Sequence, residues 1–593
     1  MSRHLLLLTL GPVQEFIAQA RRTRDLWYGS HLLSELGRAA ARALLEGGAD
    51  LIFPALTKGN PELAPCPSPL RPGGKSPLNI ANKLLAEVPA GIDPARVARD
   101  TREAVMRFWR EDIAVPVKVK CAGLLADNID SVWTEQIDTF IEFLASWAPL
   151  GEYSATRRRV EQAIVARKSL RGFAPWTSQR GNVPKSSLDG ARETVLRPPE
   201  QREPGLVQRY RIADDEQLDA VGLVKRAGGE PNQFVPVVNV AFACWVDLAA
   251  REASREFEAL KAACEATGVS RVARPDLPCA KQFPYDASVL LPSRWRAVFK
   301  EQGLETDGES WGRRNVWPLL EKLAEPYPYV ACLVADGDHM GRAIDHLATA
   351  EAHRAFSAAL SKFAVEARRI VEQDRRGALI YTGGDDVLAF VPVPEALACA
   401  DALRREFASV VAAACEDLPS TIRPTLSIGL GIGHVMESMG DLLGLGREAE
   451  REAKRSRNTL AVIVDKRSGR RRLWHAPWGE DPVTRLRADA ALLESRLSSR
   501  KVYEVARALM RLPKPGVTDD PRWVRVLALE VQRVLLRVGE GGMTADEVGL
   551  PLEGGTCYAT VYEPVWAWVE RLLIARTFAM ATPGLRRREK VSP

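Results

Sequence analysis

A Gly-Gly-Asp-Asp tetrapeptide at residues 383–386 is the strongest chemical signal in the sequence. Short apolar runs end at Thr382 and begin again at Val387, which predicts a β-hairpin whose tight turn presents two carboxylates. The glycines supply the backbone freedom that such a turn needs. Adjacent acids repel each other unless a cation lies between them, so Asp385 and Asp386 are candidate ligands of a divalent metal ion.

A second acidic motif, Asp336-Gly337-Asp338, ends an apolar run at 330–335. In a βαββ sheet this run would form the strand beside the hairpin, so we expect Asp336 next to Asp385. Two metal ions bridged by such carboxylates activate a 3′-hydroxyl and neutralise a leaving pyrophosphate. Either motif alone is equally well explained as an ordinary turn, but both together, in order and at strand ends, favour a metal site. We expect Asp338 on the other side of the strand, or capping the next helix.

The elements that must position these acids follow a regular order between residues 328 and 470. Short apolar runs alternate there with long amphipathic segments. The pattern predicts strands at 330–335, 378–382, 387–391, 425–431 and 459–465, and helices at 349–373, 394–414 and 441–455. Its core is the βαββαβ order of a ferredoxin-like fold, which palm domains of polymerases and nucleotidyl cyclases use.

A weaker version of the same order begins the chain. We predict strands at 4–9, 50–54 and 83–88, and helices at 13–45 and 94–111. The first strand runs into Leu10-Gly11-Pro12 with no acid, so this copy should hold no catalytic metal ion and should support the acceptor nucleotide. The predicted fold class is α/β (α+β), with a first palm at 1–130, a mainly helical region completing it at 131–325, a second palm at 326–475 and a helical domain at 476–593.

Composition narrows the class of protein. The 593 residues carry 82 Lys plus Arg against 76 Asp plus Glu, and this net charge of +6 does not by itself indicate nucleic-acid binding. The nine cysteines form no CxxC pair, which predicts no zinc site and fits a reducing cytoplasm. No apolar stretch approaches the roughly 18 residues of a membrane span, and the first residues do not form a signal peptide.

Several segments resemble one family, the polymerase-like large subunits of type III CRISPR effector complexes. Residues 328–345, 353–364, 379–390 and 426–434 resemble the second palm of the type III-B subunit, and residues 11–36 resemble its first palm. Weaker similarity fills the middle, so the resemblance extends over most of residues 1–470. It covers the helical region after residue 470 only in position and character.

The resemblance implies a subunit that makes cyclic oligoadenylate messengers from ATP, with Mg²⁺ or Mn²⁺, once target RNA is bound. Its implied partners are the guide RNA, the subunit that binds the guide 5′-handle, a small helical subunit and the backbone subunits, with no membrane. Two alternatives stay open. Some relatives couple ATP to S-adenosylmethionine, and a scaffold subunit would bind nucleotide or guide RNA without catalysis.

The resemblance also assigns site residues. It implies metal binding by Asp336, Asp385 and Asp386, a close approach of nucleotide to the turn at Gly383 and Gly384, and triphosphate near Ser427 and Lys454. Ser30, in the segment DLWYGS, matches a position near the acceptor ATP, although a serine there also suits an ordinary helix. Lys454 is equally well interpreted as a solvated helix charge beside Glu450.

The sequence departs from the family pattern at two places. None of the seven histidines is followed by Asp, so we expect no HD-type nuclease activity from this chain. Where many relatives carry a cysteine pair, this chain reads Lys185-Ser186-Ser187-Leu188-Asp189-Gly190, so we expect that zinc site to be absent.

Overall fold

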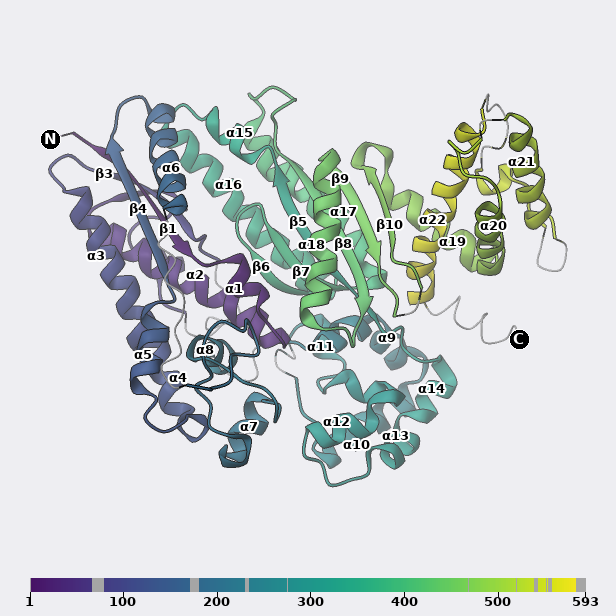
Figure 1. Ribbon diagram of the computed structural model, residues 1–593, viewed down its shortest axis with the longest axis horizontal. Coiled ribbons are helices and arrows are strands. Elements are labelled where there is room, and N and C mark those ends of the chain that lie inside the picture. The colour runs from purple at the N-terminus through teal and green to yellow at the C-terminus, as the bar shows by residue number, and fades with distance from the viewer. Residues whose placement is uncertain are drawn as a thin grey trace.

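The computed structural model describes residues 2–66, 79–170, 181–229, 234–272, 274, 276–467, 469–518, 520–537, 542–550, 552 and 557–582. Two β-sheets lie in these residues, one toward the left of Figure 1 and the other near its middle, with helices around and between them. The mixed α/β class with two palms, predicted from the sequence, is confirmed.

The second sheet carries the Gly-Gly-Asp-Asp turn and has six strands in the order β10-β9-β8-β5-β7-β6. Its four strands β8-β5-β7-β6 have the ferredoxin-like order, and every strand predicted there is present. The last strand, β10, was not predicted. The strands are β5 (Tyr329–Asp338), β6 (Ala378–Thr382), β7 (Val387–Pro392), β8 (Thr425–His434), β9 (Thr459–Val464) and β10 (Arg472–Pro477), and the main helices are α15 (Met340–Asp345), α16 (Ala350–Arg369), α17 (Val393–Phe407) and α18 (Met439–Ser456).

The first sheet repeats this order as β2-β3-β1-β4. Its fourth strand comes from beyond residue 130, within the region predicted to be mainly helical, and pairs with β1 from His4–Pro149 to Gly11–Glu142. This strand was missed in the sequence. The elements are β1 (His4–Gly11), α1 (Gln14–Ala18), α2 (Thr23–Glu46), β2 (Asp50–Phe53), β3 (Lys83–Val88), α3 (Pro94–Arg107) and β4 (Glu142–Pro149).

The single helix predicted over 13–45 is wrong, because the chain breaks between α1 and α2. The ammonium group of Lys225, 1% exposed, donates to the carbonyls of Phe16, Ile17 and Gln19, which ends α1. Burial lowers the pKa of Lys225 to about 7. The carboxylate of Asp25 then accepts from the backbone at the start of α2.

The rest of the described chain is mainly helical. The middle region holds α4 (Val115–Lys120), α5 (Asp130–Asp138), α6 (Tyr153–Ser169), α7 (Pro204–Tyr210), α8 (Ala220–Ala227), α9 (Val237–Glu252), α10 (Ser254–Thr267), α11 (Pro278–Lys281), α12 (Trp295–Glu301), α13 (Gly308–Asn315) and α14 (Trp317–Leu323). After β10 come α19 (Pro482–Ser495), α20 (Ser499–Arg511), α21 (Arg522–Leu535) and α22 (Ala559–Ala581). These four helices lie beyond β10, at the right of Figure 1.

Polar contacts tie the two palms together. The Tyr153 hydroxyl on α6 lies 2.7 Å from Nδ1 of His353 on α16, and Arg157 forms an ion pair with Asp345. The Ser357 hydroxyl accepts from the backbone N–H of Ala55 at 3.0 Å. Because α16 belongs to the second palm, these contacts fix its position relative to the first.

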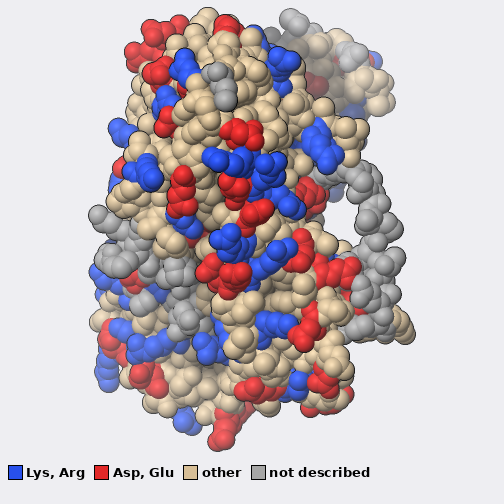
Figure 2. All heavy atoms as spheres, turned by 90° about the vertical axis from the view of Figure 1, so that its left-hand side faces the viewer, with Lys and Arg blue, Asp and Glu red and all other residues tan. Residues whose placement is uncertain are grey.

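Charge on the outside is mixed. On the face that Figure 2 shows, basic and acidic side chains are interspersed, as the small net charge predicts. None of the helices in the described ranges combines the length and the apolar character needed to cross a bilayer.

Candidate functional site

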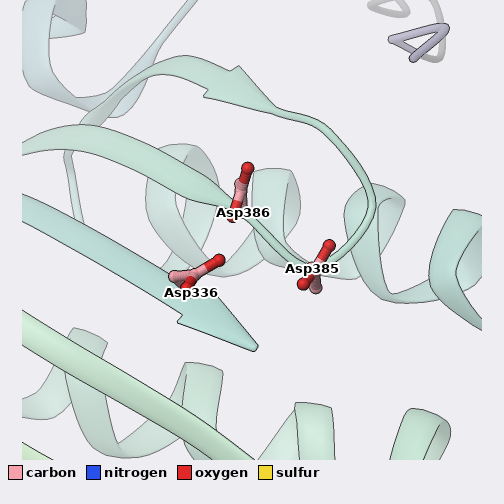
Figure 3. Close-up of side chains that lie close together, drawn as sticks. All are labelled: Asp336, Asp385 and Asp386. Atoms are coloured by element: carbon pink, nitrogen blue, oxygen red, sulfur yellow. The ribbon is translucent and has the colours of Figure 1, made fainter. Parts of the chain in front are cut away.

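Three carboxylates meet where β5 ends and the β6–β7 hairpin turns (Figure 3). Oxygens of Asp336, Asp385 and Asp386 all lie within 4.8 Å of one another. The turn is closed by a hydrogen bond of 3.0 Å from the N–H of Gly383 to the carbonyl of Asp386. Gly384 has φ +90°, a conformation that residues with a side chain rarely adopt. The structure thus brings together the three acids that the sequence predicted to act jointly.

Burial and repulsion between neighbouring carboxylates dominate the electrostatics of this cluster. Burial, followed by the charge of Asp336, raises the pKa of Asp385 to about 7. Burial and a hydrogen bond with Asp336 raise the pKa of Asp386 well above its usual range. A hard divalent cation prefers carboxylate oxygens and would offset this repulsion, so the donor set fits such an ion.

Lys454 on α18 lies against the acids. Its ammonium group forms an ion pair with Asp336 and lies 3.3 Å from Asp338, and it donates to the carbonyl of Gly337 at 2.8 Å. Burial lowers the pKa of Lys454, but the hydrogen bond to Asp336 and the charge of Asp336 outweigh burial, so the pKa is raised. The interpretation of Lys454 as a solvated helix charge is therefore wrong. Its side chain is only 24% exposed and belongs to the acidic site.

Asp338 has a role that the sequence did not reveal. Lys454 contacts both Asp336 and Asp338, so both acids face α18. Residues two apart on a strand point to the same side. The expectation that Asp338 lies on the other side of the strand is therefore wrong. Asp338 does not cap α15 either. Its carboxylate, with a fully buried side chain, accepts hydrogen bonds from the Thr425 hydroxyl at 2.8 Å, the Ser427 hydroxyl at 2.9 Å and the backbone N–H of Asn458 at 2.9 Å.

The hydrogen bond to Asp338 also fixes the position of the Ser427 hydroxyl. Ser427 is fully buried on β8 opposite Asp336, and its hydroxyl is engaged by Asp338. The predicted contact of Ser427 with triphosphate stays a prediction, and it requires this hydrogen bond to open. The sequence held a signal for this contact. Thr425 and Ser427 are two residues apart on β8 and therefore occupy one face of it, where both can meet an acid on the neighbouring strand β5.

The two glycines of the turn differ in what surrounds them. A side chain at Gly383 would collide with the Tyr381 ring and hydroxyl, whereas one at Gly384 would meet only Leu360, at 3.9 Å. Burial and the charges of Asp386 and Asp385 raise the pKa of Tyr381. Gly383 is thus required by the tyrosine, and Gly384 by its backbone angle.

Ser30 lies on α2, far in sequence from the residues of the acidic site, and is 2% exposed. That helix packs against β6, the strand that leads into the turn. Its predicted place near the acceptor ATP stays a prediction.

The segment 185–190 is held without thiols. The hydroxyl of Ser186 lies 3.1 Å from a carboxylate oxygen of Asp219, and burial, followed by the charge of Asp189, raises the pKa of Asp219 to about 6. The backbone N–H of Ser187 donates to the carbonyl of Gln217 at 2.7 Å. Hydrogen bonds thus link this segment to the chain around residue 218.

Comparison with known proteins matches two parts of the chain to domains of one family. Residues 329–461 match the model of the Cas10/Cmr2 second palm domain, a nucleotidyltransferase-like family, and residues 5–114 match that of the N-terminal part of the CRISPR-associated protein Cmr2. The chain is 24% identical to the CRISPR system Cmr subunit Cmr2 of Pyrococcus furiosus, over 87% of this chain and 68% of that protein.

Solved structures share the fold. A chain of the type III-B Cmr-beta complex in its apo state superimposes with a TM-score of 0.62 at 14% identity, covering 97% of this chain and 81% of that one. A chain of the same complex bound to cognate target RNA gives a TM-score of 0.61 at 14% identity, covering 97% and 83%. The two matched domains and the related Cmr2 protein, together with this shared fold, support a Cmr2 large subunit of a type III-B CRISPR complex.

Proposed function

We propose that this chain synthesises cyclic oligoadenylate from ATP when target RNA binds to its type III-B ribonucleoprotein. The observation that carries the proposal is the convergence of Asp336, Asp385 and Asp386 at one hairpin turn. A protein that only held RNA would gain nothing from three carboxylates that repel one another. The second-palm family match supports nucleotidyl transfer as the class of reaction.

The residues have distinct tasks in this proposal. Asp336, Asp385 and Asp386 would hold Mg²⁺ or Mn²⁺, which on binding supply charge neutralisation for the reacting 3′-hydroxyl and for pyrophosphate. Lys454 would exchange part of its contact with Asp336 for a phosphate oxygen, because an ammonium group binds either anion. Asp338 would keep Lys454 and the end of β5 in place through its bonds to β8.

The reaction balances without a further reactant. The 3′-oxygen of one adenosine bonds to the α-phosphorus of another ATP, and the bond from that phosphorus to the bridging oxygen breaks. Pyrophosphate leaves and the hydroxyl proton passes to solvent or to a carboxylate. Ring closure repeats the step within one chain. We assign the acceptor nucleotide to the first palm near Ser30, and the approach to the turn to Gly383 and Gly384.

The surroundings of the subunit are part of the proposal. The chain would assemble with guide RNA, a subunit holding the guide 5′-handle, a small helical subunit and backbone subunits. The similar structure bound to cognate target RNA supports this assembly, as does the name of the Pyrococcus protein as a Cmr subunit.

The experiment is to incubate the purified assembly with ATP, Mg²⁺ or Mn²⁺, and target RNA, and to identify the product by mass spectrometry. We expect a ring of adenylates joined through 3′-oxygens. A product containing S-adenosylmethionine, added in a parallel reaction, would support the conjugating alternative. Absence of any product that depends on target RNA would favour the scaffold alternative.

We also propose that the chain degrades no DNA through an HD site, since none of its histidines precedes an aspartate. Metal-dependent loss of single-stranded DNA that co-purifies with the chain and survives Asp385→Ala would contradict this. No zinc is expected either, and stoichiometric zinc in the desalted protein would overturn that expectation.

A further inference from the structure

A cavity of about 750 Å³ lies at the opposite end of α18 from the acidic site. Met439 and Leu442, at the start of this helix, line the cavity, whereas Lys454 near its end contacts Asp336. Fifteen residues of helix separate Met439 from Lys454, which is about 22 Å. The cavity is therefore distinct from the acidic site at Asp336, Asp385 and Asp386.

The walls of the cavity concentrate arginine. Seven arginines are among the described residues that line it, against three carboxylates. The carboxylates are already engaged. Glu301 pairs with Arg294 at 2.6 Å, and Glu437 pairs with Arg467 at 3.3 Å. The third, Asp286, lies 3.4 Å from Arg211.

Three arginines at and just before the start of α2 have no such partner. Arg21, Arg22 and Arg24 form no ion pair with any residue that the structure describes. Arg24 is 5% exposed, and one terminal nitrogen of its guanidinium has no hydrogen-bond acceptor. A buried cation without an acceptor is costly, so a missing anion is the physical explanation.

Electrostatics agree with that geometry. Burial lowers the pKa of Arg24 to about 10, and burial together with the charge of Arg226 lowers the pKa of Arg22. Cations that depress one another's pKa values gain when an anion enters between them. On the face in Figure 2, by contrast, basic and acidic groups are interspersed.

The remaining walls suit a base or sugar beside a phosphate. Arg24 lies over the rings of Tyr210 and Phe234, at 5.5 and 5.3 Å from their centroids. Phe234, Val435 and Met436 add apolar surface to the lining. Guanidinium groups bind phosphate oxygens in a fixed two-donor geometry, and the volume is within the range of small-ligand pockets.

We propose that this cavity is a second nucleotide site, which binds a nucleoside triphosphate through its phosphates. A compact polyanion suits arginines that converge from α2, from residues 209–211 and from residues 271–294 better than an extended strand does. The proposal does not depend on the activity of the acidic site.

The test uses the full-length chain in EDTA, because the acidic cluster repels phosphate when no metal ion is present. ATP and inorganic tripolyphosphate are titrated calorimetrically into wild type, into Arg21→Gln/Arg22→Gln, and into Asp385→Ala/Asp386→Ala. We expect both probes to bind wild type and the aspartate variant equally, and the arginine variant to bind about tenfold or more weakly.

The matched control is Arg159→Gln, which removes an exposed arginine from α6 and should leave binding unchanged. Arg24→Gln, checked for its melting temperature, tests the buried member. Failure of both probes to bind wild type would overturn the proposal, as would equal binding by the arginine variant. A single-stranded RNA of 12 nucleotides is titrated as a third probe. If only this RNA binds to wild type, and the arginine variant does not bind it, the cavity is an RNA site and the assignment to a nucleoside triphosphate is overturned.

Discussion

The two palms have the same strand order but differ where the first strand of each sheet ends. In the second palm, Ala335 pairs with Val387 on one side and Ile428 on the other, and Asp336 follows. In the first palm, Thr9 has the corresponding partners, Lys83 and Leu144, and the residue that follows is Leu10. Leu10 is 3% exposed and belongs to the apolar core.

The hairpins differ in the same way. Residues 383–386 join β6 to β7 in a turn that carries two acids, whereas β2 and β3 are separated by the long segment 54–82. The first sheet shows that this fold forms without any of the three carboxylates. The acids of the second palm are therefore explained by chemistry and not by the architecture.

The largest effect should come from removing the acids of the turn. We expect Asp385→Ala/Asp386→Ala to reduce product formation from ATP about a thousandfold or more, because transition-state stabilisation by bound metal ions is lost. Folding and guide-RNA co-purification should remain, since the turn is not part of the core. Asp50→Ala removes an exposed acid from the first sheet and is the control. Product at more than about a tenth of the wild-type rate, a loss under about 1.4 kcal/mol, would contradict the assignment.

Substituting one lysine from each palm should have different effects on stability. Lys454→Met leaves the buried Asp338 without its ammonium partner, so we expect a loss of about 1.5 to 3 kcal/mol in the free energy of unfolding. Lys83→Met breaks a partly exposed ion pair in the first palm, in which the Lys83 ammonium lies 2.7 Å from a carboxylate oxygen of Glu161, and should cost under about 1 kcal/mol. Urea melts in EDTA measure both. Equal losses would show that Lys454 is not held by the acids.

The free energy of unfolding should fall as pH rises, because of the carboxylates in the turn. The pKa of Asp385 is about 7 in the folded chain, raised by burial and by Asp336, so the folded state holds more protons than the unfolded state between about pH 4 and 7. Stability contributed by this group is therefore present at low pH and falls as pH rises through that window.

In EDTA we expect the difference in melting temperature between Asp385→Asn/Asp386→Asn and wild type to grow from pH 5.5 to pH 8. Saturating Mg²⁺ should raise the wild-type melting temperature most at the higher pH, since it replaces the protons. A difference that does not change with pH would contradict the repulsion among these carboxylates.

The sequence sufficed for the second palm because its signals are local. Each strand from 330 to 465 is a short buried run bounded by turn residues, and the turn at 383–386 needs its glycines wherever it folds. The sequence also predicted that Asp336 lies beside the turn, because the βαββ order makes β5 and β7 neighbouring strands. β4 was missed because it is an edge strand whose side chains are mostly half-exposed, so it lacks a clear alternation.

The other errors came from contacts distant in sequence. The break after α1 depends on Lys225, more than 200 residues away, so no local pattern marks it. Asp338 is held by residues 425–458, which its own neighbourhood cannot show. The arginines of the cavity come from four separate stretches of chain and become a cluster only in the fold.

The last comparison takes one glycine from each palm. Gly384 has φ +90° in the turn, and Gly59 has φ +83° after β2, with no atom within 4 Å of a side chain placed there. Alanine at either position should cost about 1 to 2 kcal/mol of stability for the same backbone reason. Only Gly384→Ala should also slow product formation, because it shifts Asp385 and Asp386 within the turn. Thermal melts and oligoadenylate yield for the two variants separate these effects. An equal loss of yield would mean that stability, and not the geometry of the turn, limits the reaction.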